Sequence, residues 1–231
     1  MGEKHGEYAE RELRVCLESI AWKCDFYRYH SIESIQLFEE AAYKAEEVDV
    51  NDSKAIAFAK SALLTASGAK SARAFSEGKM KSEAHLIAAA QAVHSLGDII
   101  ANAAYWALGL AVDMDEKDLK AIDLSRGRRN AKVDEVAKTA MQVLWEMPEY
   151  KYLTAFVNVT KHRRLVPVSV RAELSPVQTQ SGGICIQRIE YEHVCYEVKW
   201  AADFLRVDMP KVMEQTVTIG HALEVALGVE T

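Results

Sequence analysis

The sequence lacks the short motifs that mark several large enzyme classes. It contains no glycine-rich phosphate loop, no GxSxG nucleophile motif and no HExxH zinc motif. Its four cysteines (Cys16, Cys24, Cys185 and Cys195) form no CxxC pair, so neither a zinc site nor a disulfide framework is predicted. We therefore predict no metal and no cofactor, and we expect reduced, partly buried thiols.

An excess of positive charge is also missing. The 231 residues carry a formal net charge of −6, which argues against broad, sequence-independent binding to nucleic acid but leaves room for a local basic patch. Hydrophobic residues make up 49% of the chain, enough for one large domain, 1–231, with a sizeable core. The first residues, MGEKHGEYAERELRV, are charged and hold no apolar signal core, so we expect a cytoplasmic protein.

The longest apolar stretch, residues 86–112, contains no Lys or Arg and is long enough to span a bilayer. Four polar residues interrupt it: Gln91, His94, Asp98 and Asn102. Each of them is costly at bilayer depth. We therefore predict the buried central helix of a soluble bundle and no membrane partner.

Apolar residues at three- and four-residue steps predict a mainly α protein. The expected helices cover 7–48, 53–75, 79–112, 131–146, 148–163 and 210–228, with at most a short helix around 115–123. The stretch SEGK at 76–79 predicts a turn, and Asn130 predicts the cap of the helix that follows it. Helices joined by short turns indicate antiparallel neighbours in a bundle.

After residue 165 the apolar residues change from three- and four-residue spacing to alternation, which predicts β-structure. Val166, Val168 and Val170 alternate with other side chains, which favours a half-buried strand over 166–174. A loop over 175–183 and a second strand over 184–198 follow. The expected fold is thus an antiparallel helical bundle with a small antiparallel β-hairpin, about 165–198, inserted before the last helix.

The polar residues of the central helix form one stripe. Gln91, His94, Asp98 and Asn102 are three, four and four residues apart, so they share a helix face. A hydrogen bond from the His94 ring to the Asp98 carboxylate would fix the tautomer of His94, as a general acid–base histidine or a metal ligand requires. The alternatives are a catalytic or ligand-binding role, a metal site, and a buried structural network that fixes helix register.

A second stripe lies on the predicted helix 148–163, where Thr154, Asn158 and His162 step by four. If this helix packs beside the central one, Asn158 and His162 converge on His94 and Asp98. Two imidazoles, a carboxylate and the nearby cations Lys161, Arg163 and Arg164 would suit phosphodiester cleavage, one histidine acting as base and the other as acid. Alternatively, the cations complement the dipole of the helix C-terminus.

A further basic cluster lies in SRGRRNAK at 125–132. Arg126, Arg128 and Arg129 surround Gly127 just before a predicted helix N-terminus, where backbone amides also attract anions. This arrangement favours a contact with phosphate or the RNA backbone. The alternative is a solvated loop, since the surrounding chain is acidic.

The segment VNVTKH resembles the motif of the HEPN superfamily, helical domains found in prokaryotic defence and toxin systems. Active members cut RNA without metal and carry an arginine, a small polar residue and a histidine. Asn158 and His162 match the polar residue and the histidine, whereas Val157 stands at the arginine position. The resemblance implies RNA or nucleotide binding, or metal-independent ribonuclease activity, at a site formed by a homodimer.

Two other classes of function fit the same residues. One is a non-catalytic interaction or scaffold protein, in which the polar stripes are structural. The other is a bundle that binds a small molecule or a metal through the stripe around His94.

Overall fold

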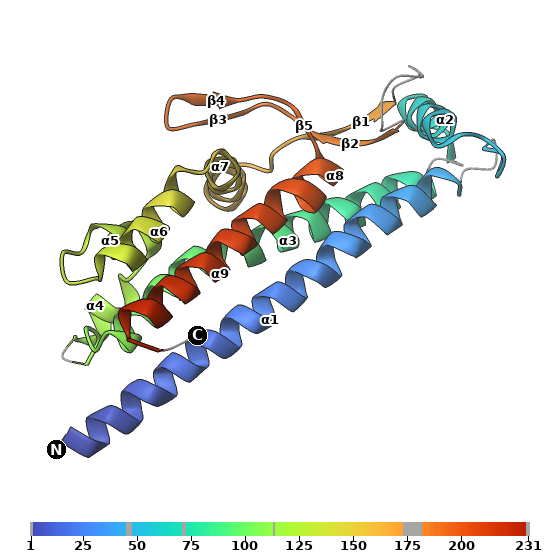
Figure 1. Ribbon diagram of the computed structural model, residues 1–231. Coiled ribbons are helices and arrows are strands. Elements are labelled where there is room, and N and C mark those ends of the chain that lie inside the picture. Colours follow the sequence, from blue (N-terminus) through green and yellow to red (C-terminus); the bar gives the residue numbers. More distant parts are fainter. Residues whose placement is uncertain (1, 45–47, 71–72, 113, 173–181, 230–231) are drawn as a thin grey trace. The chain divides into compact units, whose positions relative to one another are not determined.

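The computed structural model describes residues 2–44, 48–70, 73–112, 114–172 and 182–229. Its helices are α1 (Gly2–Ala42), α2 (Lys54–Ala66), α3 (Arg73–Ala107), α4 (Glu116–Lys120), α5 (Leu124–Arg129), α6 (Glu135–Glu146), α7 (Pro148–His162), α8 (Ala201–Asp203) and α9 (Met209–Ala226) (Figure 1). A π-helical turn, Phe204–Asp208, joins α8 to α9. The strands are β1 (Val168–Ala172), β2 (Gly182–Ile186), β3 (Ile189–Tyr191), β4 (Val194–Tyr196) and β5 (Lys199–Trp200). The predicted fold class, mainly α with a small antiparallel sheet before the last helix, is confirmed.

Contacts within the chain group it into two compact units. Unit 1 comprises Met1–Phe26, Gln91–Thr154 and Met209–Thr231, and unit 2 comprises Tyr27–Ala90 and Ala155–Asp208. The long helices α1 and α3 and the shorter α7 each supply residues to both units.

The core of unit 1 contains α6 packed against α5 and α9. Asp134 caps α6 by accepting a hydrogen bond from the backbone N–H of Val136 at 2.8 Å. One face of α6 is buried, through Ala137, Ala140, Met141 and Leu144. Gln215 of α9 donates to the carbonyl of Ala140 at 3.0 Å, so a polar contact accompanies the apolar one.

Unit 2 contains both small sheets. The first has the order β1-β2-β5, is antiparallel and pairs Val168 with Ile186 and Ala172 with Gly182. Helix α2 packs on β1 and β2. The second sheet is the hairpin β3-β4, closed by a two-residue turn at Glu192 and His193.

Several predicted boundaries are wrong for identifiable reasons. Residues 76–79 lie inside α3 and do not form a turn, because Gly78 allows a close approach of α3 to α1: a Cβ there would lie 2.2 Å from the Cβ of Ala41. The helix after Asn130 begins at Glu135 with Asp134 as its cap, and Asn130 instead ends α5. The strand predicted over 184–198 is not continuous: it covers part of β2, then β3 and β4, and it ends before β5 begins at Lys199.

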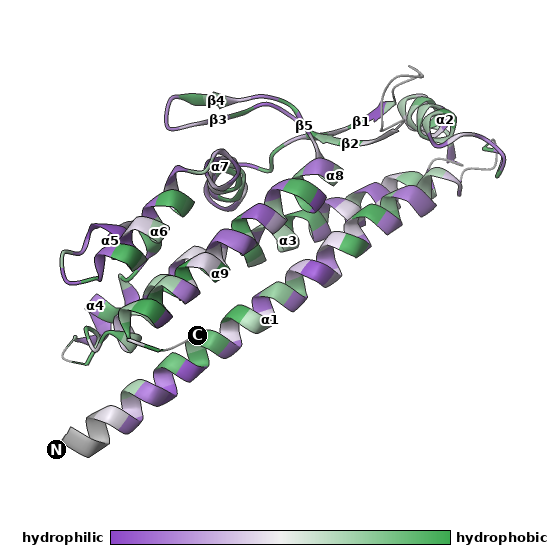
Figure 2. Ribbon diagram, viewed as in Figure 1, coloured by the Kyte–Doolittle hydropathy of each residue, from purple (hydrophilic) through white to green (hydrophobic). Residues whose placement is uncertain are grey.

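Hydropathy along the helices is mixed. Figure 2 shows hydrophilic and hydrophobic residues interleaved along α1. Within the residues that the structure describes, no helix combines the length and the apolarity that a membrane crossing needs.

Candidate functional site

The predicted stripe on α3 contacts the short segment that leads into α5, within unit 1. The Asp98 carboxylate accepts a hydrogen bond from the backbone N–H of Leu124 at 3.2 Å. The Asn102 side chain donates to the carbonyls of Asp98 and Ile122, both at 3.1 Å. Gln91, by contrast, is exposed. Asp98 and Asn102 therefore bind backbone groups at the start of α5, which supports the structural alternative for this part of the stripe.

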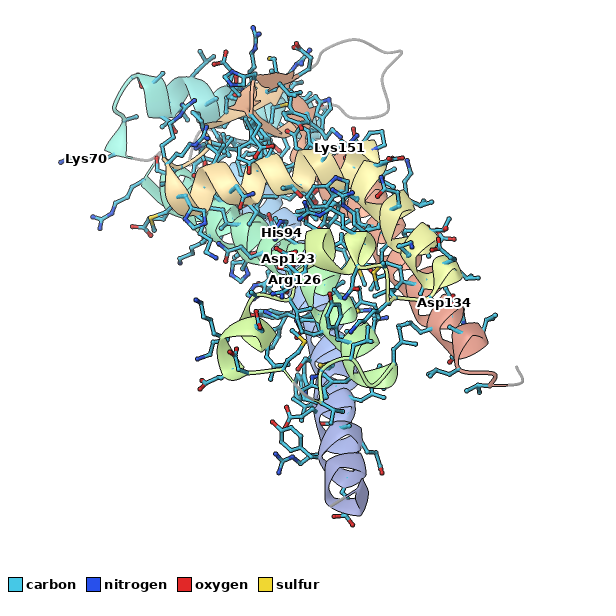
Figure 3. All side chains as sticks on the ribbon, turned by 90° about the vertical axis from the view of Figure 1, so that its left-hand side faces the viewer. Lys70, His94, Asp123, Arg126, Asp134 and Lys151 are labelled. Carbon is cyan, nitrogen blue, oxygen red and sulfur yellow. The ribbon has the colours of Figure 1, made fainter. Side chains whose placement is uncertain are left out.

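His94 stacks on a residue that sequence reasoning missed. Its ring lies parallel to that of Tyr150, with the centroids 5.9 Å apart. Burial raises the pKa of the Tyr150 hydroxyl, and the negative charges of Asp98 and Asp123 raise it further. Figure 3 shows the side chains of His94, Asp123 and Arg126 one below another in unit 1.

Room for the Tyr150 hydroxyl is provided by a glycine in the middle of α3. A Cβ at Gly97 would lie 2.6 Å from the Tyr150 hydroxyl oxygen. The sequence signal that could have found this contact is the glycine itself, since glycine inside a helical pattern often has a packing reason. Among the described residues, no group of three or more His, Cys, Asp or Glu side chains could hold a metal ion.

Asn158, from the second predicted stripe, lies in unit 2 and contacts the β3-β4 hairpin. The Asn158 amide donates to the Tyr191 hydroxyl at 3.0 Å. The Arg163 guanidinium lies over the Tyr191 ring, 5.4 Å from its centroid. Val157, at the position of the HEPN arginine, is only 4% exposed and belongs to the core.

The end of α7 carries a run of exposed basic residues, Lys161, His162, Arg163 and Arg164, which we call the basic cluster. None of them forms an ion pair with a carboxylate in the part of the chain that the structure describes. Other cations do: Lys60 pairs with Asp52 at 2.6 Å. The basic cluster is therefore a concentration of basic side chains that form no ion pair within the described part of the chain.

A groove of about 430 Å³ begins at the basic cluster, where Arg163 lines it together with residues 190–195 of the hairpin. Its other lining residues include Tyr191, His193 and the acidic Glu190 and Glu192. The two carboxylates repel anions from the hairpin side, so an anionic ligand is directed toward the basic cluster.

The two stripes do not lie in one unit, and the second is itself divided, because Thr154 belongs to unit 1. His94 and Asp98 belong to unit 1, whereas Asn158 and His162 belong to unit 2. Their convergence on one composite site stays a prediction.

The arginines of SRGRR lie on α5, a helix of six residues, and not in a loop directly before a helix N-terminus. Arg126 contacts the Asp118 carboxylate at 3.2 Å. Arg128 lies 4.4 Å from the centroid of the Trp145 ring and donates to Gln142 at 3.0 Å. Arg129 donates to the Ser125 carbonyl at 2.8 Å. All three therefore make contacts within the protein, and a role in phosphate binding stays a prediction.

Comparison with protein-family models, with curated proteins and with solved structures gives no match. The fold and the sites define a mainly helical protein whose basic cluster at the end of α7 has no ion-pair partner among the residues described. Its function is argued from these residues.

Proposed function

We propose that this chain is a HEPN-like helical protein that binds single-stranded RNA or a nucleotide through the basic cluster. One observation carries the proposal: four consecutive exposed basic residues lack an acidic partner among the described residues, in a chain whose net charge is −6. Leaving like charges together costs free energy, and a phosphate ligand removes that cost.

The helix dipole accounts for only part of this cluster. Lys161 lies in the last turn of α7, where a cation is stabilised by about 0.3–1 kcal/mol. Arg163 and Arg164 follow the last helical residue. Arg163 is held over the Tyr191 ring, which orders its guanidinium for a bidentate contact with phosphate.

The proposed role is binding without cleavage. Val157 is buried where active HEPN members carry arginine, and Asn158 already donates to Tyr191. Of the matching motif only His162 is exposed to a ligand, and a single imidazole cannot serve as both acid and base at the same moment. The hydrogen bonds of Asp98 and Asn102 to backbone groups support the same non-catalytic role for α3.

The proposed protein is a homodimer, as the resemblance implies. Helix α1 exposes Val15, Trp22 and Phe26, which are seven and four residues apart and share one face. Apolar side chains on one face favour pairing with a second copy. Light scattering after size exclusion tests this: Trp22→Glu should yield monomer, whereas Leu63→Glu, at an apolar position of α2 that is even more exposed, should not. A wild-type monomer at high micromolar concentration contradicts the dimer.

Fluorescence anisotropy with a labelled single-stranded RNA tests the binding proposal. The double variant Lys161→Ala/Arg164→Ala removes two cations of the basic cluster, and Lys117→Ala/Lys120→Ala on α4 is the control with the same change in net charge. We expect at least a tenfold loss of affinity in the first and little change in the second. The slope of log affinity against log salt should fall by about 0.7 per lost phosphate contact.

The same samples show whether the protein cleaves the RNA that it binds. They also show whether its ligand is RNA or a mononucleotide. Intact RNA after long incubation with chelator is the expected result, and competition by a nucleoside monophosphate measures whether one phosphate suffices. Cleavage that disappears in His162→Ala would instead establish a ribonuclease. Equal affinities of the two double variants would refute the basic cluster as the RNA site.

A further inference from the structure

Unit 2 contains a pocket of about 280 Å³ that is distinct from the basic cluster. It is lined by residues of α1, α2, β2, α8 and the π-helical turn. Its apolar wall consists of Ile35, Phe38, Phe58 and Ile184. The rings of Phe38 and Phe58 stack at 4.8 Å with an interplanar angle of 14°, so the fully buried Phe58 supports Phe38 from behind.

The charges of the residues that line the pocket do not sum to zero. The Lys54 ammonium and the Glu39 carboxylate lie 2.5 Å apart and neutralise each other. The Arg206 guanidinium also lines the pocket, and it makes no hydrogen bond or ion pair within the described ranges of the chain. The pocket therefore combines an apolar wall with one uncompensated positive charge.

The backbone that carries Arg206 is irregular but firmly attached. Arg206 lies in the π-helical turn, a conformation that is rare and often found at functional sites. The residues around it are anchored: the Leu205 carbonyl accepts a hydrogen bond from the Tyr27 hydroxyl at 2.5 Å, and the Asp208 carboxylate pairs with Lys199. This attachment fixes the position from which the arginine side chain extends.

A glycine of β2, Gly182, also lines the pocket. A Cβ at Gly182 would lie 2.3 Å from the ring of Phe58, so only glycine lets β2 approach this ring. The close approach keeps Phe58 fully buried beneath the pocket. Any larger residue at position 182 would displace the Phe58 ring, on which Phe38 stacks.

We propose that this pocket binds a small organic monocarboxylate with an apolar body, in which the carboxylate pairs with Arg206 and the body packs on Ile35 and Phe38. A monoanion matches the single free cation, whereas a dianion such as a phosphate monoester would leave one negative charge unpaired beside Glu39. Arginine provides two parallel N–H groups in the geometry that a carboxylate requires.

Calorimetric titration of the full chain with octanoate and with 1-octanol tests the proposal, because the two probes share the apolar body and differ in charge. We expect octanoate to bind at least about tenfold more tightly than octanol. Arg206→Gln should abolish this preference, and Arg206→Lys should restore part of it. Arg73→Gln, an exposed arginine of unit 2 that pairs with Glu77, is the matched control and should retain the full preference.

A second variant tests the pocket without touching charge. Ala202→Leu adds three carbon atoms at a lining position and should weaken both probes alike. Far-ultraviolet circular dichroism and thermal unfolding identify any variant that fails to fold. The proposal is overturned if octanoate does not bind at millimolar concentration, if octanol binds equally well, or if folded Arg206→Gln keeps the preference for octanoate.

Discussion

The Asn158 side chain donates a hydrogen bond to the Tyr191 hydroxyl at 3.0 Å and so attaches the β3-β4 hairpin to α7. Tyr191 is the last residue before a turn in which Glu192 and His193 have φ angles of +49° and +65°. Side chains other than glycine adopt this region at a cost of about 1–2 kcal/mol each. The contact with α7 helps to hold a turn that its own residues disfavour.

A double-mutant cycle measures this contact. Asn158→Ala and Tyr191→Phe should each lower the free energy of unfolding by about 1 kcal/mol, and the double variant should lose less than the sum because both remove the same hydrogen bond. Urea unfolding measures the change in unfolding free energy for each single variant and for the double variant. Strictly additive losses would show that the two side chains do not interact.

The strained turn predicts a substitution that stabilises the protein. His193→Gly relieves a positive φ angle and should raise the free energy of unfolding by about 1 kcal/mol. Glu190→Gly in the neighbouring strand β3 is the control, because glycine in an extended position costs about 0.5–1 kcal/mol. The midpoint temperature of thermal unfolding should therefore rise for His193→Gly and fall for Glu190→Gly. A loss of stability in His193→Gly would contradict the role of strain.

Local signals in the sequence sufficed for some elements. Helix α7 begins at Pro148 as predicted, because proline favours the first turn of a helix. Strand β1 (Val168–Ala172) lies inside the predicted strand, because alternation of side chains follows from the geometry of a strand itself. Both signals come from residues that are close together in the sequence, so they can be recognised without knowledge of the fold.

Features that depend on distant residues could not be predicted in this way. Gly78 and its sequence neighbours indicate a turn. In the structure, glycine is required at this position because Ala41 approaches it closely. The turn at Glu192 and His193 contains neither glycine nor asparagine, so nothing in the sequence marks the end of β3. Tyr150 became a candidate only when its ring was found against His94.

Gly97 should be intolerant of alanine, although alanine favours helices. The added Cβ would lie 2.6 Å from the Tyr150 hydroxyl oxygen, and we expect a net loss of about 1–3 kcal/mol. Gly220→Ala in α9 is the matched control, since its Cβ would meet nothing within 4 Å, and it should gain up to about 1 kcal/mol. Tyr150→Phe removes the clashing oxygen, so Gly97→Ala should cost much less in that background. An equal cost in both backgrounds would exclude the hydroxyl as the obstacle.

Acidification should destabilise unit 2 through a pair of histidines. The Nδ1 atoms of His30 and His85 lie 2.9 Å apart, close enough to share one proton, and the ring of Tyr29 packs against both. Partial burial lowers the pKa of His30 below its ordinary value of 6.5, and the neighbouring His85 lowers it further, whereas Glu33 opposes the shift.

The direction of the effect follows from proton uptake. With a lowered pKa in the folded state, the unfolded chain binds more protons as the pH falls through 6.5, so acid favours unfolding. His30→Gln removes this uptake and should flatten the decrease in unfolding free energy between pH 7.5 and 5.5, a range above that in which most carboxylates titrate. His85→Gln should flatten it less, because it removes the repulsion from the second ring but leaves the burial of His30, the larger cause of the lowered pKa. Urea unfolding at several pH values provides the slopes, and a variant slope equal to that of the wild type would show that the pair does not sense pH.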